Sequence, residues 1–91
     1  MTMAITVYSS PNCSQCRMTK HILERDGITY TPVDLSTDLD AHRFVTRELG
    51  YKQAPIVYVQ YPDGHTEHWG GLRPDRLGAY ITAMNEQESA A

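Results

Sequence analysis

Long apolar runs are absent from this sequence of 91 residues, because its hydrophobic stretches extend for only a few residues each. No segment is therefore long enough for a transmembrane helix, which needs about 20 predominantly apolar residues. Residues 1–8 also lack a basic region followed by an apolar stretch, so no secretory signal is expected there. From these absences we expect a cytoplasmic protein without a membrane partner.

Positive charge is scarce as well, since 8 Lys and Arg residues stand against 11 Asp and Glu residues, for a net charge of -3. A nucleic-acid partner would favour a basic face, so none is expected. Hydrophobic residues at 41% and charged residues at 21% are ordinary for a globular protein and argue against disorder. A chain of this length can bury one core. We expect one domain over residues 1–84, followed by a polar, frayed tail over residues 85–91.

Cysteine is also scarce, and the sequence contains two, Cys13 and Cys16. Two cysteines are too few for a secreted scaffold held together by disulfides. A bridge across so short a loop would restrict the unfolded chain little, so fold stabilisation is a poor reason for the pair. A single C-x-x-C in a small chain without a signal indicates redox or metal chemistry.

The hydrophobic pattern predicts seven elements in the order βαβαββα. Strands are expected at residues 5–8, within 28–35, and at 56–60 and 66–69; helices are expected at 13–26, at 39–49 and from 74 onward. Apolar residues Leu39, Phe44, Val45 and Leu49 define the expected buried face of the second helix. The first two strands should be parallel, because a helix connects them. The last two should form an antiparallel hairpin, because residues 61–64 have strong turn chemistry. The fold class is therefore α/β, with a small mixed four-stranded sheet flanked by three helices.

The C-x-x-C follows a predicted strand and opens a predicted helix. A thiolate at a helix N-terminus faces unpaired backbone N–H groups and the positive end of the helix dipole, which favours its formation. We expect Cys13 to be the exposed nucleophile and Cys16, one turn inside, to resolve the mixed disulfide. Arg17 and Lys20 are nearby cations. Two inert cysteines, or half of a zinc site, are the alternatives.

His65 and His68 are the candidates for the other half of a zinc site. They are separated from the cysteines by 48 residues, whereas a compact zinc finger has about 12–15. Positions 65 and 68 of a strand also face opposite sides of the sheet, which is poor geometry for one ion. We therefore expect no metal site and no bound cofactor.

Pro55 lies immediately before the most strand-like segment. Because proline lacks the N–H that a central strand needs, it belongs at the start of a strand or in a special turn. The Ala54-Pro55 bond is a candidate for a cis peptide, although most X-Pro bonds are trans.

Five short motifs together resemble the NrdH-type redoxins, glutaredoxin-like members of the thioredoxin superfamily. They are C-S-Q-C at 13–16, V-D-L-S at 33–36, L-G-Y at 49–51, Q-A-P-I-V at 53–57 and H-W-G-G-L-R-P-D at 68–75. The last is similar to the family's W-S-G-F-R-P-D signature, with Gly70 and Leu72 in place of Ser and Phe. The resemblance covers residues 5–83 and implies a thioredoxin-like fold.

This resemblance implies a dithiol carrier that is reduced by thioredoxin reductase and reduces the large subunit of class Ib ribonucleotide reductase. It further implies a cis Pro55, whose neighbouring backbone pairs with an extended substrate segment. Around the dithiol, the residues expected to contact partners are Gln15, Ala54, Pro55, Trp69 and Arg73. Arg73 and Asp75 are expected to pair with each other. We expect the protein to act as a monomer.

Two alternatives stay open at this point. Gly70-Gly71 is similar to a Gly-Gly pair that glutaredoxins use near glutathione. The first alternative is therefore a glutathione-dependent glutaredoxin, which has the same fold and a different electron source. A non-catalytic module that senses redox state, or holds a metal through its C-x-x-C, belongs to a different functional class. Trp69 also has a second interpretation, as an ordinary core residue.

Overall fold

A computed structural model describes residues 3–90, and the side chains of residues 3–87. The elements are β1 (Ala4–Ser9), α1 (Ser14–Arg25), β2 (Thr31–Asp34), α2 (Leu39–Arg43), η1 (Phe44–Glu48), β3 (Ile56–Gln60), β4 (Thr66–Gly70) and α3 (Pro74–Ala90). The four strands form one sheet in the order β2-β1-β3-β4. This confirms the predicted element order and the mixed α/β sheet.

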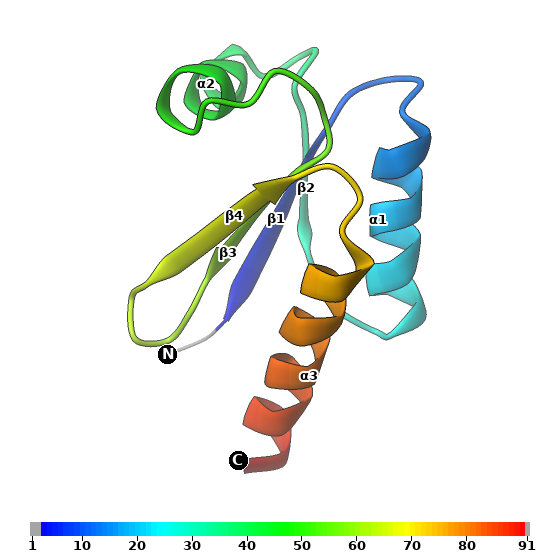
Figure 1. Ribbon diagram of the computed structural model, residues 1–91, viewed down its shortest axis with the longest axis vertical. Coiled ribbons are helices and arrows are strands. Elements are labelled where there is room, and N and C mark those ends of the chain that lie inside the picture. The colour runs from blue at the N-terminus through cyan, green and yellow to red at the C-terminus, as the bar shows by residue number, and fades with distance from the viewer. Residues whose placement is uncertain (1–2, 91) are drawn as a thin grey trace.

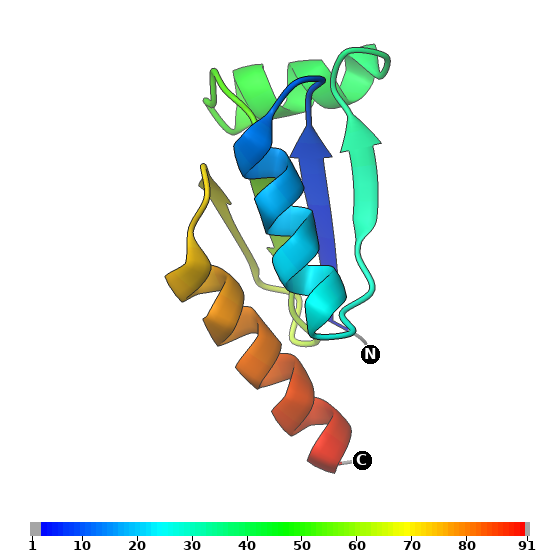
Figure 2. The ribbon, with the colours of Figure 1, turned by 90° about the vertical axis from the view of Figure 1, so that its right-hand side faces the viewer.

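The sheet is parallel between β1 and β2 and antiparallel between its other neighbours. Pro32 lies in β2, at the edge of the sheet, where a missing backbone N–H is tolerated. Helices α1 and α3 lie on one face of the sheet, and α2 lies at the other side of its upper end (Figures 1 and 2). The same upper end contains the last residue of β1, the first residue of α1 and the first residue of β3 (Figure 1).

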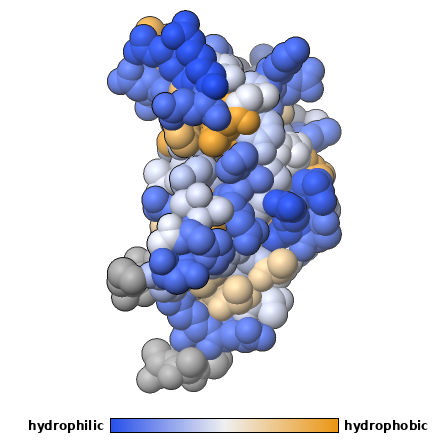
Figure 3. All heavy atoms as spheres, turned by 60° about the vertical axis from the view of Figure 1, so that its left-hand side comes forward, coloured by the Kyte–Doolittle hydropathy of each residue, from blue (hydrophilic) through white to orange (hydrophobic). Residues whose placement is uncertain are grey.

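Two hydrophobic clusters hold these layers together. The larger one lies between the sheet and the helices α1 and α3, and includes Val7, Leu23, Val57 and Leu77, each with 0% exposure. The smaller one, Leu35, Val45 and Ile56, lies where α2 and η1 meet the sheet. On the mostly hydrophilic face in Figure 3, hydrophobic atoms gather directly beneath the helix at the top of the molecule.

The helix expected at residues 39–49 differs from the prediction in two ways. It is α-helical to Arg43 and then widens into the π-helix η1, whose last bond runs from Leu49 N–H to the Phe44 carbonyl at 3.1 Å. Leu39 was expected on the buried face and is 71% exposed. No residue of α2 is buried, and the first buried side chain of this segment is Val45 in η1. Gly50 follows this segment with a φ of 82°.

The segment expected to be a frayed tail is mostly helical, because α3 continues to Ala90. Ala91 lies outside the described residues, and the domain boundary at residue 84 stays a prediction. Leu77 and Tyr80 of α3 are buried. Over residues 3–90, no helix has the length and apolar character needed to cross a membrane.

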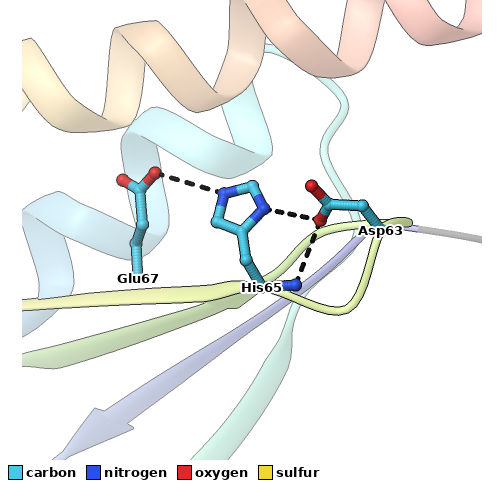
Figure 4. A network of polar contacts seen from close by, with 3 residues as sticks. All are labelled: Asp63, His65 and Glu67. Atoms are coloured by element: carbon cyan, nitrogen blue, oxygen red, sulfur yellow. Dashed lines mark hydrogen bonds and ion pairs between the residues drawn. The ribbon is translucent and has the colours of Figure 1, made fainter.

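The β3–β4 hairpin has a polar tip at the end of the sheet remote from Pro55. His65 stacks on Tyr61, with ring centroids 4.2 Å apart. Its Nδ1 lies 2.5 Å from Asp63 Oδ1 and its Nε2 lies 3.6 Å from Glu67 Oε2, as Figure 4 shows. Hydrogen bonding to Asp63, with the added charge of Glu67, raises the pKa of His65 above 6.5. The two candidate zinc ligands have other partners, since His65 contacts Asp63 and His68 contacts Tyr51.

Candidate active site around the Cys13–Cys16 pair

The two cysteines lie at the N-terminus of α1, as predicted, and are joined in a disulfide. Cys13 is the N-cap residue, and its Sγ accepts a hydrogen bond from the Cys16 backbone N–H at 3.1 Å. Cys13 is half-buried, whereas Cys16 is only 2% exposed. The Sγ of Cys13 is therefore the sulfur that an incoming molecule can reach, and it already faces a helix N–H that stabilises negative charge.

The first two turns of α1 carry the cations Arg17 and Lys20. The first turn of α1 contains no acidic residue. Lys20 Nζ donates to the buried hydroxyl of Ser9 at 3.1 Å, at the end of β1. Two hydrogen bonds from Ser36, and the charge of Lys20, hold the pKa of Asp34 below its usual value. The Asp34 carboxylate is therefore negatively charged and hydrogen-bonded within its own turn.

Pro55 closes one side of the site. The Ala54-Pro55 peptide bond is cis, as the family resemblance implies. Pro55 is buried, and its carbonyl accepts the Gly71 N–H at 2.8 Å. Ala54 is half-buried beside it. The bond between Pro55 and Gly71 joins the proline turn to the loop that follows β4.

Gln15 connects the dithiol to that same loop. Its side-chain oxygen accepts the Leu72 backbone N–H at 3.2 Å, across 57 positions of sequence. This internal role could not be predicted from the sequence, because nothing in the local pattern of the C-x-x-C indicates a distant backbone partner. Gln15 is also exposed, so its expected contact with a partner stays a prediction.

Arg73 and Asp75 form the expected pair at the start of α3. The guanidinium donates to both carboxylate oxygens, from Nε at 3.1 Å and from Nη2 at 2.9 Å. These bonds hold the pKa of Asp75 below its usual value. Because both side chains are exposed, the pair orients the loop rather than stabilising the fold strongly.

Trp69 belongs to the core rather than to a contact surface. Its ring is 5% exposed and packs within the larger hydrophobic cluster. The guanidinium of Arg76 lies 5.4 Å from the ring centroid, within cation–π range. The indole Nε1 has no hydrogen-bond partner among the described residues. Burial leaves little of the ring for a partner to touch, so the interpretation of Trp69 as a core residue is the one the structure favours.

A groove of about 560 Å³ opens beside Cys13. Its apolar floor consists of Leu35, Val45 and Ile56, the smaller hydrophobic cluster. Lys52 and Tyr51 lie along one wall. Tyr51 was not predicted to lie in the site, although the L-G-Y motif contains it.

Tyr51 is held in this wall by two residues of β4. Its hydroxyl lies 2.7 Å from His68 Nδ1, and the two rings meet edge to face. A Cβ atom at Gly70 would lie 3.0 Å from Tyr51 Cδ1, so the glycine makes room for the ring. The departure from the family signature at Gly70 thus has a local cause. His68, considered from sequence as a zinc ligand, contacts Tyr51 instead.

The part of the chain that the structure describes contains no cluster of three or more His, Cys, Asp or Glu side chains suited to a metal ion. The cysteines bond to each other, and each candidate histidine has another partner. The arrangement is one for thiol–disulfide exchange, in which a reachable sulfur and a buried sulfur share one bond.

Comparison with known proteins agrees with this geometry. The sequence model of the glutaredoxin family matches residues 5–61. The chain belongs to the glutaredoxin family. Within this glutaredoxin family, the glutaredoxin-like protein NrdH of Salmonella typhimurium is 35% identical over 75 residues, which cover 82% of this chain and 85% of the relative. The gene 56 protein of Mycobacterium phage L5 is 31% identical over 85 residues, or 93% of this chain and 79% of the relative.

Solved structures place the fold in the same group. The NrdH-redoxin of Escherichia coli superposes with a TM-score of 0.69 and 29% identity, over 84% of this chain and 92% of that protein. The resemblance to NrdH-type redoxins and the thioredoxin-like fold are therefore both confirmed. Together with the Cys13–Cys16 pair, they identify a glutaredoxin-like redox protein of the electron-carrier type.

Proposed function

We propose that this protein is a cytoplasmic dithiol–disulfide carrier that acts as a monomer. One observation carries the proposal: a reachable Cys13 and a buried Cys16 share a disulfide at the start of α1, beside Pro55. In the reduced protein, the Cys13 thiolate attacks a client disulfide, forms a mixed disulfide and releases one client thiolate. The Cys16 thiolate then attacks the Cys13 sulfur and releases the second client thiolate. The client gains two electrons, and the protein returns to the disulfide form.

The electron acceptor that we propose is the large subunit of class Ib ribonucleotide reductase, and the donor is thioredoxin reductase. Similarity to the NrdH proteins supports both partners. The structure of the Escherichia coli relative was described for the thioredoxin-like activity profile of that glutaredoxin-like protein, which supports a thioredoxin-type donor here. The residues that we propose for contact with these proteins are Gln15, Ala54 and Arg73, together with the backbone beside the buried Pro55.

A glutathione-dependent glutaredoxin is the second candidate. The match to the glutaredoxin family and the cationic Lys52 beside Cys13 favour it. Both candidates use the same two cysteines, so the electron donor is what distinguishes them.

A coupled assay tests the choice of donor. The oxidised protein is mixed with NADPH and thioredoxin reductase, or with NADPH, glutathione and glutathione reductase, and NADPH consumption is followed with a disulfide client present. We expect rapid turnover with thioredoxin reductase and slow or no turnover with glutathione. Rapid turnover with glutathione alone would reject the proposed donor and leave a glutaredoxin.

A further inference from the structure

The outward face of α1 carries a row of basic side chains. Arg17, His21 and Arg25 recur at every fourth position, so they lie on one side of the helix. All three are exposed, and none of them lines the groove beside Cys13. Figure 2 shows α1 on the outer side of the sheet, running from the dithiol end toward the opposite end of the molecule. These three residues and Met18 are called the α1 stripe below.

The charge of α1 is opposite in sign to that of the whole chain. The helix carries Arg17, Lys20 and Arg25 against one acidic residue, Glu24, whereas the chain has a net charge of -3. Glu24 already has a partner, because its Oε2 accepts a hydrogen bond from the Tyr30 hydroxyl at 2.5 Å. The outward side of α1 is therefore a local concentration of positive charge on an acidic protein.

The two arginines of the α1 stripe have few partners within the protein itself. No carboxylate among residues 3–87 forms an ion pair with Arg17. Arg25 contacts Asp26, from Nη2 to Oδ2 at 3.5 Å, and both side chains of that pair are exposed. Each guanidinium thus keeps N–H donors that the carboxylates of another molecule can accept.

Met18 adds a second, independent feature to the stripe. It lies beside the cations of the same helix face and is 46% exposed, although it is a large hydrophobic residue. Arg and Met are both enriched where proteins bind one another, and the flexible thioether of Met adapts to an apolar partner surface. A phosphate backbone gains nothing from Met18, and the net negative charge of the chain opposes it. The stripe therefore fits a protein surface that combines carboxylates with an apolar side chain.

A protein that reacts at Cys13 can reach the whole stripe. At a rise of 1.5 Å per residue, Arg17 lies about 6 Å and Arg25 about 18 Å along the helix from Cys13. A standard interface covers about 800 Å² on each partner, which is wide enough to include both. The electron donor is the partner that returns in every cycle, whichever client is reduced, so a permanent surface feature suits the donor best.

We infer that the α1 stripe is the docking surface for the electron-donor protein, which presents carboxylates around an apolar side chain. The inference rests on the proposed function, since it concerns the donor of the same dithiol. The reaction is an exchange: the donor's dithiol becomes a disulfide, the Cys13–Cys16 disulfide becomes a dithiol, and NADPH restores the donor.

Steady-state kinetics with NADPH and thioredoxin reductase test the inference, with the oxidised protein as the varied substrate. At low ionic strength, Arg25→Gln should lower kcat/KM about twofold to threefold, the size typical of one exposed ion pair. Arg17→Gln combined with Arg25→Gln should lower it about fivefold to tenfold. The loss for Arg25→Gln should appear in KM rather than in kcat, because exposed charges act on association.

Salt separates the charged part of the stripe from its apolar part. The loss for Arg25→Gln should disappear at 1 M salt, where the screening length is about 3 Å. Met18→Ser should lower kcat/KM about threefold, and this loss should persist at 1 M salt because it comes from apolar contact.

Arg47→Gln is the matched control, because it removes the same charge from η1, which follows α2 on the other side of the sheet. Arg47 is exposed, as Arg25 is, so both variants change the net charge equally. Arg47→Gln should keep kcat/KM close to the value of the unmodified protein. Dithiothreitol, a small uncharged reductant, should reduce Arg25→Gln at the unmodified rate, since Arg25 is remote from the two sulfur atoms.

Equal losses for Arg25→Gln and Arg47→Gln, or a loss for Arg25→Gln that persists at 1 M salt, would overturn the inference while the carrier function stands. A loss with the large subunit of class Ib ribonucleotide reductase but none with thioredoxin reductase would assign the stripe to the client and also overturn it. If a short DNA duplex bound the unmodified protein but not the double variant, the stripe would be a nucleic-acid site. No turnover of the unmodified protein with thioredoxin reductase would reject the proposed donor, and the inference with it.

Discussion

Gly70 allows the Tyr51 ring to lie against β4, because a side chain at this position would meet the ring. Tyr51 then reaches His68 through its hydroxyl and forms one wall of the groove beside Cys13. A residue without a side chain thus shapes the site at a distance from the reacting sulfur.

Gly70→Ala should lower the free energy of unfolding by about 1–2 kcal/mol, because a methyl group 3.0 Å from Tyr51 Cδ1 overpacks the contact. Urea denaturation measures the effect. Tyr51→Ala in the same chain should make the added methyl group harmless.

Gly78→Ala is the matched control, since Gly78 lies in α3 and a Cβ there meets nothing within 4 Å. It should raise the free energy of unfolding by about 0.5–1 kcal/mol through helix propensity. Equal responses at Gly70 and Gly78 would contradict the packing account of the Tyr51 wall.

At the residue scale, the sequence was sufficient to predict the two reactive cysteines but not the tertiary contacts around them. The location and relative burial of Cys13 and Cys16 follow from a C-x-x-C between a strand and a helix, and both are confirmed. The bond from Gln15 to Leu72 could not be predicted, because it joins residues far apart in the chain. Trp69 shows the same limit, since only the folded packing decides whether an aromatic ring faces the core or a partner.

At the scale of elements, α2 depends on its first turn, because it buries no residue of its own. Its N-cap is Asp38, whose Oδ1 accepts the Ala41 N–H at 3.0 Å. The segment that follows, η1, carries Val45 into the floor of the groove. Capping at Asp38 therefore supports the floor of the groove.

Asp38→Ala should lower the free energy of unfolding by about 1 kcal/mol, the usual cost of losing an N-cap. Asp38→Asn keeps an oxygen that can accept the same bond, so it should retain most of the stability. Thermal or urea denaturation of both variants checks this. Identical losses for Ala and Asn would show that the carboxylate charge, and not the cap, is what matters.

The hairpin tip offers a prediction about pH. His65 lies between Asp63 and Glu67, and its pKa is raised mainly by the hydrogen bond to Asp63 (Figure 4). Its contribution to stability is fully present below pH 6.5 and is lost as the pH rises through the higher folded pKa. The pKa of Asp63 is lowered, chiefly by the His65 backbone N–H, so its contribution is present above pH 3.8 and is lost as the pH falls through the lower folded value.

An NMR titration of the histidine rings should give a midpoint for His65 above 6.5. Asp63→Asn should move that midpoint down toward 6.5, because it removes the nearest carboxylate. A midpoint at or below 6.5 in the unmodified protein would show that the contact does not form in solution.

Element boundaries were predicted well where the local signals were strong. β3 has the predicted bounds, and α1 begins just after Cys13 and ends before Gly27, whose φ is 71°. The π-helical turn at η1 was not predicted, because the apolar spacing of this segment is compatible with an ordinary α-helix. The helical tail to Ala90 was also missed, since its small polar residues indicate neither a helix nor a break.

At the scale of the whole molecule, three segments distant in sequence meet at one end of the sheet. They are the dithiol turn, the Pro55 turn and the loop after β4, and two hydrogen bonds, Gly71 to Pro55 and Leu72 to Gln15, link them. The order of strands and helices was sufficient to predict the sheet and the end at which the dithiol lies. The groove between the dithiol turn, the segment around Pro55 and η1 could not be predicted, because its shape depends on tertiary packing.

The central claim is that electrons leave this protein through Cys13, with Cys16 as the resolving thiol. The most direct test uses the reduced Cys16→Ser variant, mixed with the oxidised large subunit of class Ib ribonucleotide reductase and analysed by mass spectrometry without reductant. Because attack is retained and resolution is lost, we predict a stable mixed disulfide through Cys13 that dithiothreitol releases, and none with Cys13→Ser. A mixed disulfide through Cys16 in the Cys13→Ser variant, or no adduct with Cys16→Ser, would contradict the account.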